Sequence, residues 1–249
     1  MSTTTTQRSS RRTPAPTPAR RSPIVPLTIA ALLIGAVVVV VLLLTSGVLN
    51  QSTSRDLATT QLDRPADLID GRAVGAADAP VTINLWEDFQ CPACGIFSRS
   101  TEPKLLEEYV ATGKVRLVYH DMAFLGQESI DAAVAARAAE QLLGAGGFWK
   151  YHDLLFHNQD GENEGGFDRT VLADMAVSLG MDRDAFRAAL DDPDLIAAVT
   201  TETQEGVAAG VSSTPTLFIN GYQVTGAPPY QTLAEYIDGL LAAASPAPQ

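Results

Sequence analysis

The stretch at 81–97 constrains the fold most, because it reads as a buried strand, a sharp turn and a helix that opens on a Cys-x-x-Cys motif. The apolar, largely β-branched residues at 81–86 are typical of a strand, and Pro92 suits the first position of a helix, where its missing N–H costs nothing. Cys91 and Cys94 are the only cysteines in the 249 residues. Any thiol chemistry of this chain must therefore take place in this motif.

A Cys-x-x-Cys motif can be half of a zinc site or a redox-active pair. A zinc site needs two further soft or imidazole ligands, and the chain has only His120, His152 and His157. His152 and His157 lie five residues apart on one predicted helix, so they do not share a face. A redox pair is favoured, because the mouth of the helix offers Cys91 free N–H groups and the positive end of the helix dipole. We expect Cys91 to be the nucleophile and Cys94, one turn further in, to be the resolving thiol.

The amino-terminal part of the chain predicts a membrane anchor. Residues 1–23 are basic and of low complexity, with five arginines and no acidic residue, and we expect them to be disordered and cytoplasmic. The apolar run at 24–44 is long enough to span the roughly 30 Å of a bilayer core as a helix. It lacks an Ala-x-Ala site and is longer than a signal-peptide core, so a single-pass signal-anchor is favoured over a cleavable signal. The preceding arginines place the rest of the chain outside the cell membrane.

The part that follows the apolar run is strongly acidic, with 12 basic and 29 acidic side chains and a formal charge of −17. This charge argues against nucleic acid or anionic lipid as its ligand. A stretch at 45–66 rich in Ser, Thr and Gln is a predicted linker, and 67–243 has the size of one globular domain. Residues 244–249 are predicted to be a disordered tail.

The domain is predicted to have an α/β fold with an inserted all-helical block, preceded by the single transmembrane helix. The expected elements are a short strand at 70–75, a strand at 81–86, a helix at 91–112, a strand at 115–119, a helical block at 128–209, a hairpin at 216–224 and a helix at 230–242. A strand–helix–strand unit of this length implies parallel pairing of its two strands. The hairpin carries an Asn-Gly turn.

The order of these motifs resembles one known family. FQCPAC at 89–94 precedes the helical block, and VSSTPTLFING at 211–221 follows it. Together they resemble the DsbA-like branch of the thioredoxin superfamily, specifically its membrane-anchored extracytoplasmic thiol:disulfide oxidoreductases, over about residues 67–243. The resemblance implies a thioredoxin fold and a redox-active disulfide, with no other cofactor and no metal. It also implies a cis peptide bond between Thr214 and Pro215, facing the cysteines, where the Thr214 backbone pairs with substrate.

One position departs from the family pattern. Relatives often carry a buried acid six residues before the first cysteine, where this chain has Leu85. Strand alternation places Glu87 on the same face as Leu85, so Glu87 could reach toward Cys94 and take over the transfer of its proton. The alternative is an exposed carboxylate at the end of the strand.

The resemblance implies an enzyme that introduces disulfides into reduced secreted or membrane proteins through Cys91 and Cys94. It would act as a monomer and be reoxidised by an integral-membrane partner of the DsbB or vitamin K epoxide reductase type. The Pro-Ala between the cysteines lacks the histidine of the strongest family oxidants, which predicts a milder oxidant.

Two alternatives stay open. A disulfide reductase or isomerase would use the same residues, although the sequence shows no dimerisation segment of the kind isomerases use. A non-catalytic metal-binding chaperone could use Cys91, Cys94 and His120; otherwise His120 is an ordinary loop residue at the end of a strand.

Overall fold

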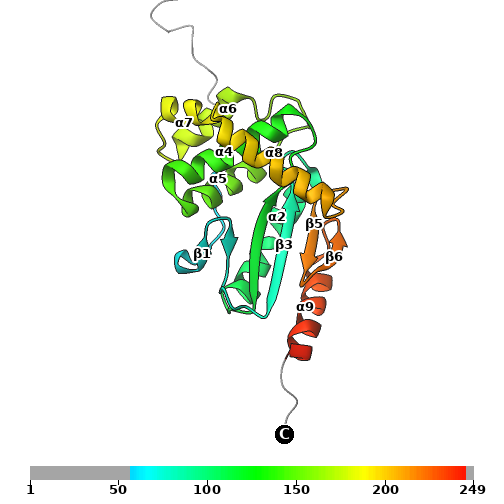
Figure 1. Cartoon of the computed structure of the whole chain (residues 1–249). Helices are drawn as coiled ribbons and strands as arrows, with labels where there is room; N and C mark the ends of the chain where they lie inside the picture. The colour runs from blue at the N-terminus through cyan, green and yellow to red at the C-terminus, as the bar shows by residue number, and fades with distance from the viewer. Residues whose placement is uncertain (1–56, 245–249) are drawn as a thin grey trace, which may run out of the picture. The chain divides into compact units, whose positions relative to one another are not determined.

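The computed structural model describes residues 57–244 (Figure 1). No helix within that range is both long and apolar enough to cross a membrane. The expected membrane segment at 24–44 lies outside the described residues, as do the basic segment at 1–23 and residues 245–249 of the predicted tail.

One mixed sheet of six strands, in the order β1-β2-β4-β3-β5-β6, forms the centre of the described part. The strands are β1 (Ile69–Asp70), β2 (Ala73–Val74), β3 (Val81–Glu87), β4 (Val115–Asp121), β5 (Thr216–Ile219) and β6 (Tyr222–Thr225). Strands β3 and β4 are parallel, with Leu85 opposite Tyr119 and Glu87 opposite Asp121, whereas the other neighbours are antiparallel. The predicted parallel unit is therefore confirmed.

The helices account for the remaining regular structure. They are α2 (Pro92–Ser100), α3 (Glu102–Leu105), the π-helical turn η2 (Leu106–Val110), α4 (Gln127–Leu143), α5 (Ala145–His157), α6 (Arg169–Ser178), α7 (Arg183–Leu190), α8 (Pro193–Ala208) and α9 (Tyr230–Ala244), with a short 3-10 turn η1 (Ala66–Leu68) before β1. Helices α4 to α8 form the insertion predicted at 128–209. The thioredoxin-like α/β fold with a helical insertion is thus confirmed.

The single helix predicted at 91–112 is wrong in detail. Helix α2 ends at Ser100, and α3 and η2 follow it to Val110. The reason is Pro103 in the first turn of α3, since a proline has no N–H and its ring clashes with the preceding turn. Gly113, with φ of 73°, then turns the chain toward β4.

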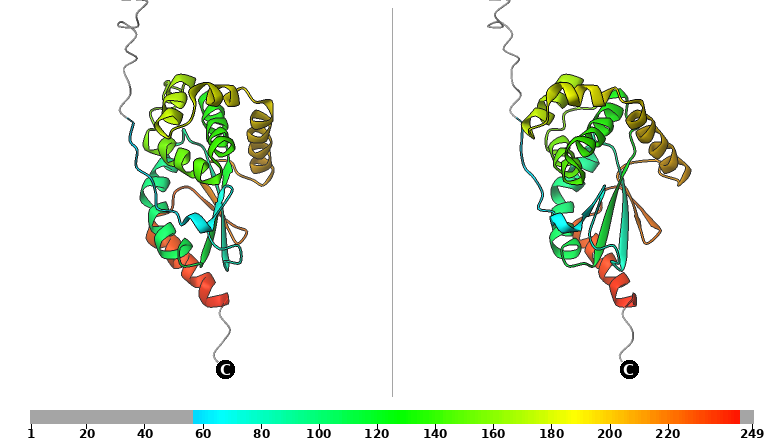
Figure 2. Two further views of the ribbon diagram at one scale, coloured as in Figure 1. Left: turned by 90° about the vertical axis from the view of Figure 1, so that its left-hand side faces the viewer. Right: turned by 60° about the vertical axis from the view of Figure 1, so that its left-hand side comes forward.

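Helices pack over one face of the sheet, and α8 lies against one end of the other face (Figure 2). Helices α2, α3 and α9 lie on one face, where Leu85, Phe97 and Ile237 belong to the main apolar core. On the other face, Trp86, Met122 and Val211 form a smaller cluster against the end of α8. The backbone of α8 at Gly206 packs directly on the Trp86 indole, since a Cβ at this position would lie 2.7 Å from the ring. The two faces of β3 therefore have different partners.

The insertion is fixed by small residues and by helix caps. Helix α4 buries a run of alanines, and α5 approaches it so closely that a Cβ on Gly147 would lie 2.5 Å from the carbonyl oxygen of Ala139. Asp168, Asp182 and Asp192 accept hydrogen bonds from the first N–H groups of α6, α7 and α8. Each such cap contributes about 1 kcal/mol.

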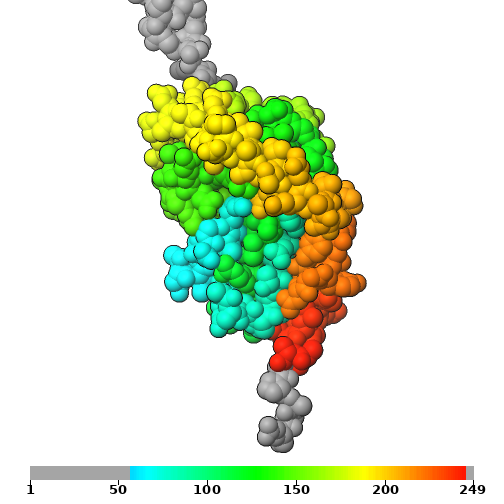
Figure 3. Space-filling view, viewed as in Figure 1, coloured from blue at the N-terminus to red at the C-terminus, as the bar shows by residue number. Residues whose placement is uncertain are grey.

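Buried ion pairs join the insertion to the sheet. Glu202 of α8 accepts from Arg72 at 2.6 Å and from Arg137 of α4 at 2.5 Å, and Arg137 also donates to Asp121 of β4 at 2.6 Å. In Figure 3 the surface of α8 runs directly into that of the β1–β2 region and of β5–β6. Breaking one member of such a network leaves an unpaired buried charge, so these contacts fix how the insertion sits on the sheet.

The segment at 57–65, predicted as part of a linker, lies along the domain, and we call it the strap. Asn158 donates to the carbonyl of Ala58 and accepts from its N–H, at 2.9 and 2.8 Å. The N–H of Leu62 donates to Asp153 at 2.8 Å, and Arg64 is buried. The linker prediction for this segment is wrong, because polar composition does not exclude specific pairing with a buried group.

Candidate active site

Cys91 is the N-cap of α2. It has extended backbone angles (φ −68°, ψ 119°), Pro92 follows in the first turn, and the Cys91 carbonyl accepts from the Gly95 N–H at 3.1 Å. The N–H groups of the first turn have no partner inside the helix, so they are available to the sulfur. The strand–turn–helix arrangement expected around this cysteine is confirmed.

These donors make Cys91 acidic. A hydrogen bond from the Cys94 thiol is the main cause that lowers the pKa of Cys91 from 9.0 to about 6. The Thr214 side chain and the N–H groups of Cys94 and Ala93 add to the effect, whereas partial burial opposes it. At neutral pH most of Cys91 is therefore the nucleophilic thiolate.

Cys94 is a very different thiol. It has no exposed surface, and burial raises its pKa well above 9.0, with further contributions from its hydrogen bond to Cys91 and from the negative charge of Glu87. Both cysteines are free thiols here, so the structure represents the reduced state. The two sulfurs thus have the properties expected of an attacking and a resolving cysteine.

Thr214 and Pro215 form the opposite wall of the site. Their peptide bond is cis, as the resemblance implied, and the Cys91 sulfur lies 3.3 Å from the Thr214 carbonyl oxygen. Thr216 starts β5 and pairs with Trp86 of β3, which brings this loop beside the cysteine turn. The structure therefore brings together both parts of the predicted site.

Glu87 is buried, so the exposed carboxylate considered as an alternative is wrong. Its side chain has no exposed surface, and its Oε2 lies 3.9 Å from Nε2 of His152 in α5. Burial raises the pKa of Glu87 to about 7, although the neighbouring His152 opposes the shift. A carboxyl with such a pKa can hold or release a proton near neutral pH, and its charge acts on the buried Cys94 thiol.

The Asp88 carboxylate stabilises the turn that precedes Cys91 through four hydrogen bonds. Its carboxylate accepts from the Gln90 N–H at 2.8 Å and from the Ser129 hydroxyl at 2.6 Å. It also accepts from the N–H groups of Phe124 and Leu125, at 3.0 and 3.1 Å. This one carboxylate therefore ties the cysteine turn to the loop that follows β4 and to α4.

Gln159 braces the turn from the insertion. Its side-chain amide donates to the carbonyls of Phe89 and Cys91, at 2.6 and 3.0 Å. Gly95 leaves room for it, because a Cβ there would lie 1.9 Å from the Gln159 side-chain oxygen. The insertion thus helps to position the nucleophile, a role that the sequence did not predict.

His120 does not belong to this site. It lies within β4 rather than in a loop, which corrects the prediction, and its ring stacks on Trp86 with centroids 4.4 Å apart. Its two ring nitrogens contact Glu202 and Asn84, both at 2.9 Å. Strand alternation puts it on the face opposite to Glu87, so it cannot join the cysteines in a metal site without rearrangement. Among residues 57–244 no group of three or more His, Cys, Asp or Glu residues is arranged to hold a metal ion.

Sequence reasoning missed His152, Asp153 and Arg64. It considered His152 as a zinc ligand, gave it no role beside the cysteines, and placed Arg64 in a linker. A signal was present, because His152 and Asp153 stand together within the otherwise apolar run YHDLLF at 151–156. Adjacent ionisable residues in such a helix indicate a buried polar partner.

Comparison with known proteins agrees with this geometry. A family model described as thioredoxin matches residues 67–239. A protein of Bacillus cereus called "Probable disulfide bond formation protein D" is 27% identical over 173 residues, which cover 67% of this chain and 77% of that protein.

Solved structures show the same likeness. The crystal structure of oxidised BdbD from Bacillus subtilis has a TM-score of 0.64 and 25% identity, covering 76% of this chain and 100% of that one. For alpha-DsbA1 from Wolbachia pipientis the TM-score is 0.63, with 20% identity over 73% of this chain and 94% of that one, a likeness of fold alone. The resemblance to DsbA-like oxidoreductases inferred from the motifs is thereby confirmed. This chain belongs to the thioredoxin family.

Proposed function

We propose that this protein is an extracytoplasmic thiol:disulfide oxidoreductase that acts as a dithiol oxidase on reduced secreted or membrane proteins. The observation that carries the proposal is the difference between its two thiols. Cys91 is acidic and sits at a helix mouth, whereas Cys94 is fully buried and weakly acidic. An incoming thiolate would attack the sulfur of Cys91, which it can reach, and Cys94 would be the leaving group. The stabilised Cys91 thiolate then favours the reduced enzyme.

The oxidase cycle follows from these roles. A substrate thiolate attacks the Cys91 sulfur of the oxidised enzyme, a substrate–Cys91 disulfide forms, the Cys91–Cys94 bond breaks, and Cys94 takes the electron pair and then a proton. A second substrate thiolate attacks the substrate sulfur of this mixed disulfide. The substrate disulfide forms, and Cys91 leaves as a thiolate. Two electrons have then passed from the substrate to the enzyme.

The pKa of Cys91 sets how oxidising the pair is. At pH 7, a pKa of about 6 instead of 9.0 stabilises the reduced enzyme by up to about 1.4 kcal/mol, since only the unit between pKa and pH counts. For a two-electron couple this raises the reduction potential by up to about 30 mV. The proposed enzyme is therefore a mild oxidant, as the Pro-Ala between the cysteines predicts.

Each turnover leaves the enzyme reduced, so it needs an electron acceptor. We propose an integral-membrane reoxidant of the DsbB or vitamin K epoxide reductase type, with the oxidoreductase acting as a monomer. The proposed single-pass anchor at 24–44 and the location outside the cytoplasm rest on the apolar run and the arginines before it. Confining both partners to one membrane would raise their effective concentration.

The equilibrium reduction potential tests the direction of electron flow. The full-length protein in detergent is equilibrated with glutathione buffers, and the fraction of reduced Cys91–Cys94 pair is measured. We expect about −190 mV, because DsbA lies at about −120 mV with a cysteine pKa of about 3.5. A value near the −270 mV or so of thioredoxin would overturn the oxidase direction and favour a reductase. A Cys91→Ser variant controls for adducts formed elsewhere.

A further inference from the structure

The strap has a single buried residue, and it is charged. The Arg64 side chain is 3% exposed, while the other residues at 57–65 are exposed or half-buried. An apolar side chain could fill this position equally well. A buried guanidinium is unfavourable unless an opposite charge lies next to it. The groups that match Arg64 therefore indicate what it is for.

Arg64 pairs with two carboxylates in the interior. It donates through Nη1 to Asp153 at 2.8 Å and through Nη2 to Glu102 at 2.7 Å. Its guanidinium also lies over the ring of Trp149, 4.4 Å from the centroid. Both carboxylates are almost completely buried, and Arg64 places a cation against each of them.

The same cluster continues to Glu87, whose charge acts on Cys94. Oδ1 of Asp153 lies 3.1 Å from Nδ1 of His152, and Nε2 of His152 lies 3.9 Å from Oε2 of Glu87. Neither Nε2 nor either Glu87 oxygen has a hydrogen-bond partner within the described chain. The His152 ring is otherwise enclosed by aromatic rings, those of Phe89, Tyr119, Phe148, Trp149 and Phe156. A continuous set of contacts thus links the strap to Glu87.

The charges of this cluster balance only when one acid is protonated. Its acids are Glu87, Glu102 and Asp153, and its cations are Arg64 and His152. Burial acts to lower the pKa of His152, and the charge of Arg64 acts in the same direction, but Asp153, Glu87 and Glu102 outweigh both and raise this pKa to about 9. The other titratable groups that act on Glu87 or are acted on by it are Cys91 and Cys94 of α2, Tyr119 of β4 and Glu102 of α3. Glu87 is the acid of this cluster whose charge acts on Cys94, so it is the one placed to exchange the proton.

We propose that Arg64 and His152 are positioning residues for proton exchange at Cys94: His152 places positive charge against Glu87, Arg64 compensates the carboxylates of Asp153 and Glu102 behind it, and together they keep Glu87 able to accept the thiol proton. The proposal rests on the redox function of the cysteine pair. During reoxidation, Cys91 has formed a mixed disulfide with the acceptor. Cys94 passes its proton to the Glu87 carboxylate and attacks the Cys91 sulfur, the Cys91–Cys94 bond forms, and the acceptor leaves as a thiolate with the electron pair. When substrate later breaks that bond, the proton returns from Glu87 to Cys94.

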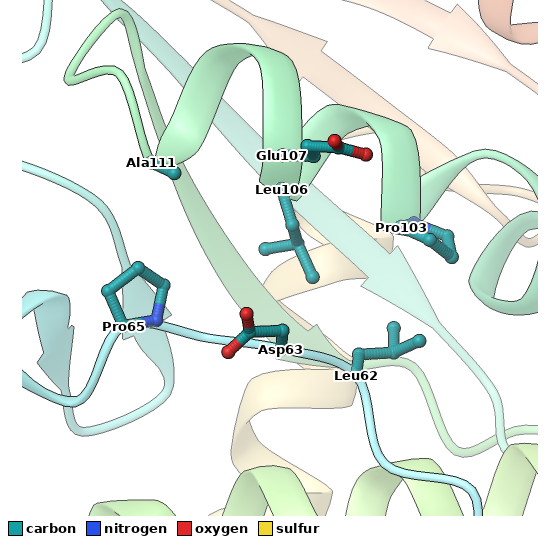
Figure 4. Close-up of a pocket in the computed structure, with 7 residues that line it drawn as sticks. All are labelled: Leu62, Asp63, Pro65, Pro103, Leu106, Glu107 and Ala111. Atoms are coloured by element: carbon teal, nitrogen blue, oxygen red, sulfur yellow. The ribbon is translucent and has the colours of Figure 1, made fainter.

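The contact of this part of the strap with the helices beside it is incomplete. A hollow of about 360 Å³ separates it from α3 and η2, lined by Leu62, Asp63, Pro65, Pro103, Leu106, Glu107 and Ala111. Figure 4 shows Leu106 directed from the helix toward the strap across this space. The docking of the strap therefore rests on Arg64, on a few hydrogen bonds and on the packing of Leu57 and Leu62 against the main apolar core, so the position of the strap is coupled to the charges of the cluster.

The aromatic disulfide DTNB tests the proposal, because it allows the reaction of Cys91 and the reaction of Cys94 to be followed as two separate phases. When the reduced full-length protein reacts with DTNB, Cys91 attacks first and releases one coloured thiolate. Cys94 then attacks the mixed disulfide and releases a second. We expect Arg64→Met and His152→Gln to leave the first phase within about twofold and to slow the second about tenfold at pH 7, less than the ~10²-fold expected for Glu87→Gln. The loss should shrink as the pH rises.

Three further variants make the test specific. Arg64→Lys keeps the charge and should restore most of the second phase. Arg72→Met removes a guanidinium from the other buried cluster and should leave both phases unchanged, which controls for general destabilisation. In a Glu87→Gln background, Arg64→Met and His152→Gln should slow the second phase no further.

The outcomes are distinct. An unchanged second phase in Arg64→Met and His152→Gln, or an additive loss in the Glu87→Gln background, overturns the proposal. If Arg64→Met does not fold, the second-phase rates of His152→Gln and Arg64→Lys decide the same question. A thioredoxin-like reduction potential with the expected phases would overturn the oxidase direction while leaving the positioning roles intact.

Discussion

The Cys91 sulfur and the Thr214 carbonyl oxygen lie 3.3 Å apart, although 123 residues separate them in the chain. The contact exists because β5 pairs with β3, so the loop before β5 and the turn after β3 meet at one end of the sheet. The nucleophile therefore has one wall from its own helix and one from a distant loop. Its acidity depends on both, and on Cys94.

The pKa of Cys91 should respond to the chemistry of residue 94. In the reduced protein, the ultraviolet absorbance of the thiolate should titrate near pH 6. Cys94→Ala removes the strongest hydrogen-bond donor to Cys91 and should raise this pKa by about one unit. Cys94→Ser keeps a donor and should raise it less. Equal shifts in the two variants would contradict the role of the donor.

The stability of the reduced protein should depend on pH through Cys91. The folded pKa of about 6 lies below the ordinary 9.0, so between these values the unfolded chain binds more protons. The contribution of Cys91 ionisation to the free energy of unfolding is complete above pH 9.0 and is lost as the pH falls through about 6. The free energy of unfolding in urea, taken relative to Cys91→Ser, should therefore rise from acid to alkaline pH, by up to about 1.4 kcal/mol per unit. A difference that does not vary with pH would be inconsistent with an acidic Cys91.

Gln159 and Gly95 should behave as one unit. Gln159→Ala removes two hydrogen bonds to the cysteine turn, and Gly95→Ala should push the same side chain away, because the new Cβ would lie 1.9 Å from its oxygen. We expect each change to slow reduction of the disulfide by dithiothreitol severalfold. The double variant should be no slower than the worse single one. Additive losses would mean that Gly95 acts independently of Gln159.

Removing the resolving thiol should trap substrates. In Cys94→Ala cells, thiol-blocked extracts should contain mixed disulfides between Cys91 and secreted proteins, visible as bands that a reductant removes. Cys91→Ala, which keeps the buried Cys94, is the matched control and should trap none, because burial keeps Cys94 out of reach. Similar adducts in both variants would count against Cys91 as the nucleophile.

The sequence predicted most of the fold, because helix and strand periods and the Asn-Gly turn are local signals. Asn220 and Gly221 adopt the positive φ values, 49° and 85°, that such a turn requires. The cysteine pair and the Thr214–Pro215 loop were also predictable, because each carries its own motif. Pro103 is a sequence signal for a break in the helix. The prediction passed over it because the residues on both sides have a helical pattern.

The rest depends on pairs that no local pattern encodes. Arg64 and Asp153 are 89 residues apart, and Glu87 meets His152 only because α5 packs on the sheet. A polar residue in a polar segment gives no sign that its side chain is buried. For that reason the strap looked like a linker, and Glu87 was found without its partner.

The buried Arg64 also determines where a soluble fragment of this protein can begin. The region that matches the family model begins at residue 67, and a fragment that starts there would lack the guanidinium and leave Asp153 and Glu102 without their cation. Loss of one partner from such a buried pair costs about 3–5 kcal/mol. A fragment that starts at or before Leu57 keeps the pair, so the catalytic unit begins before the region that matches the family model.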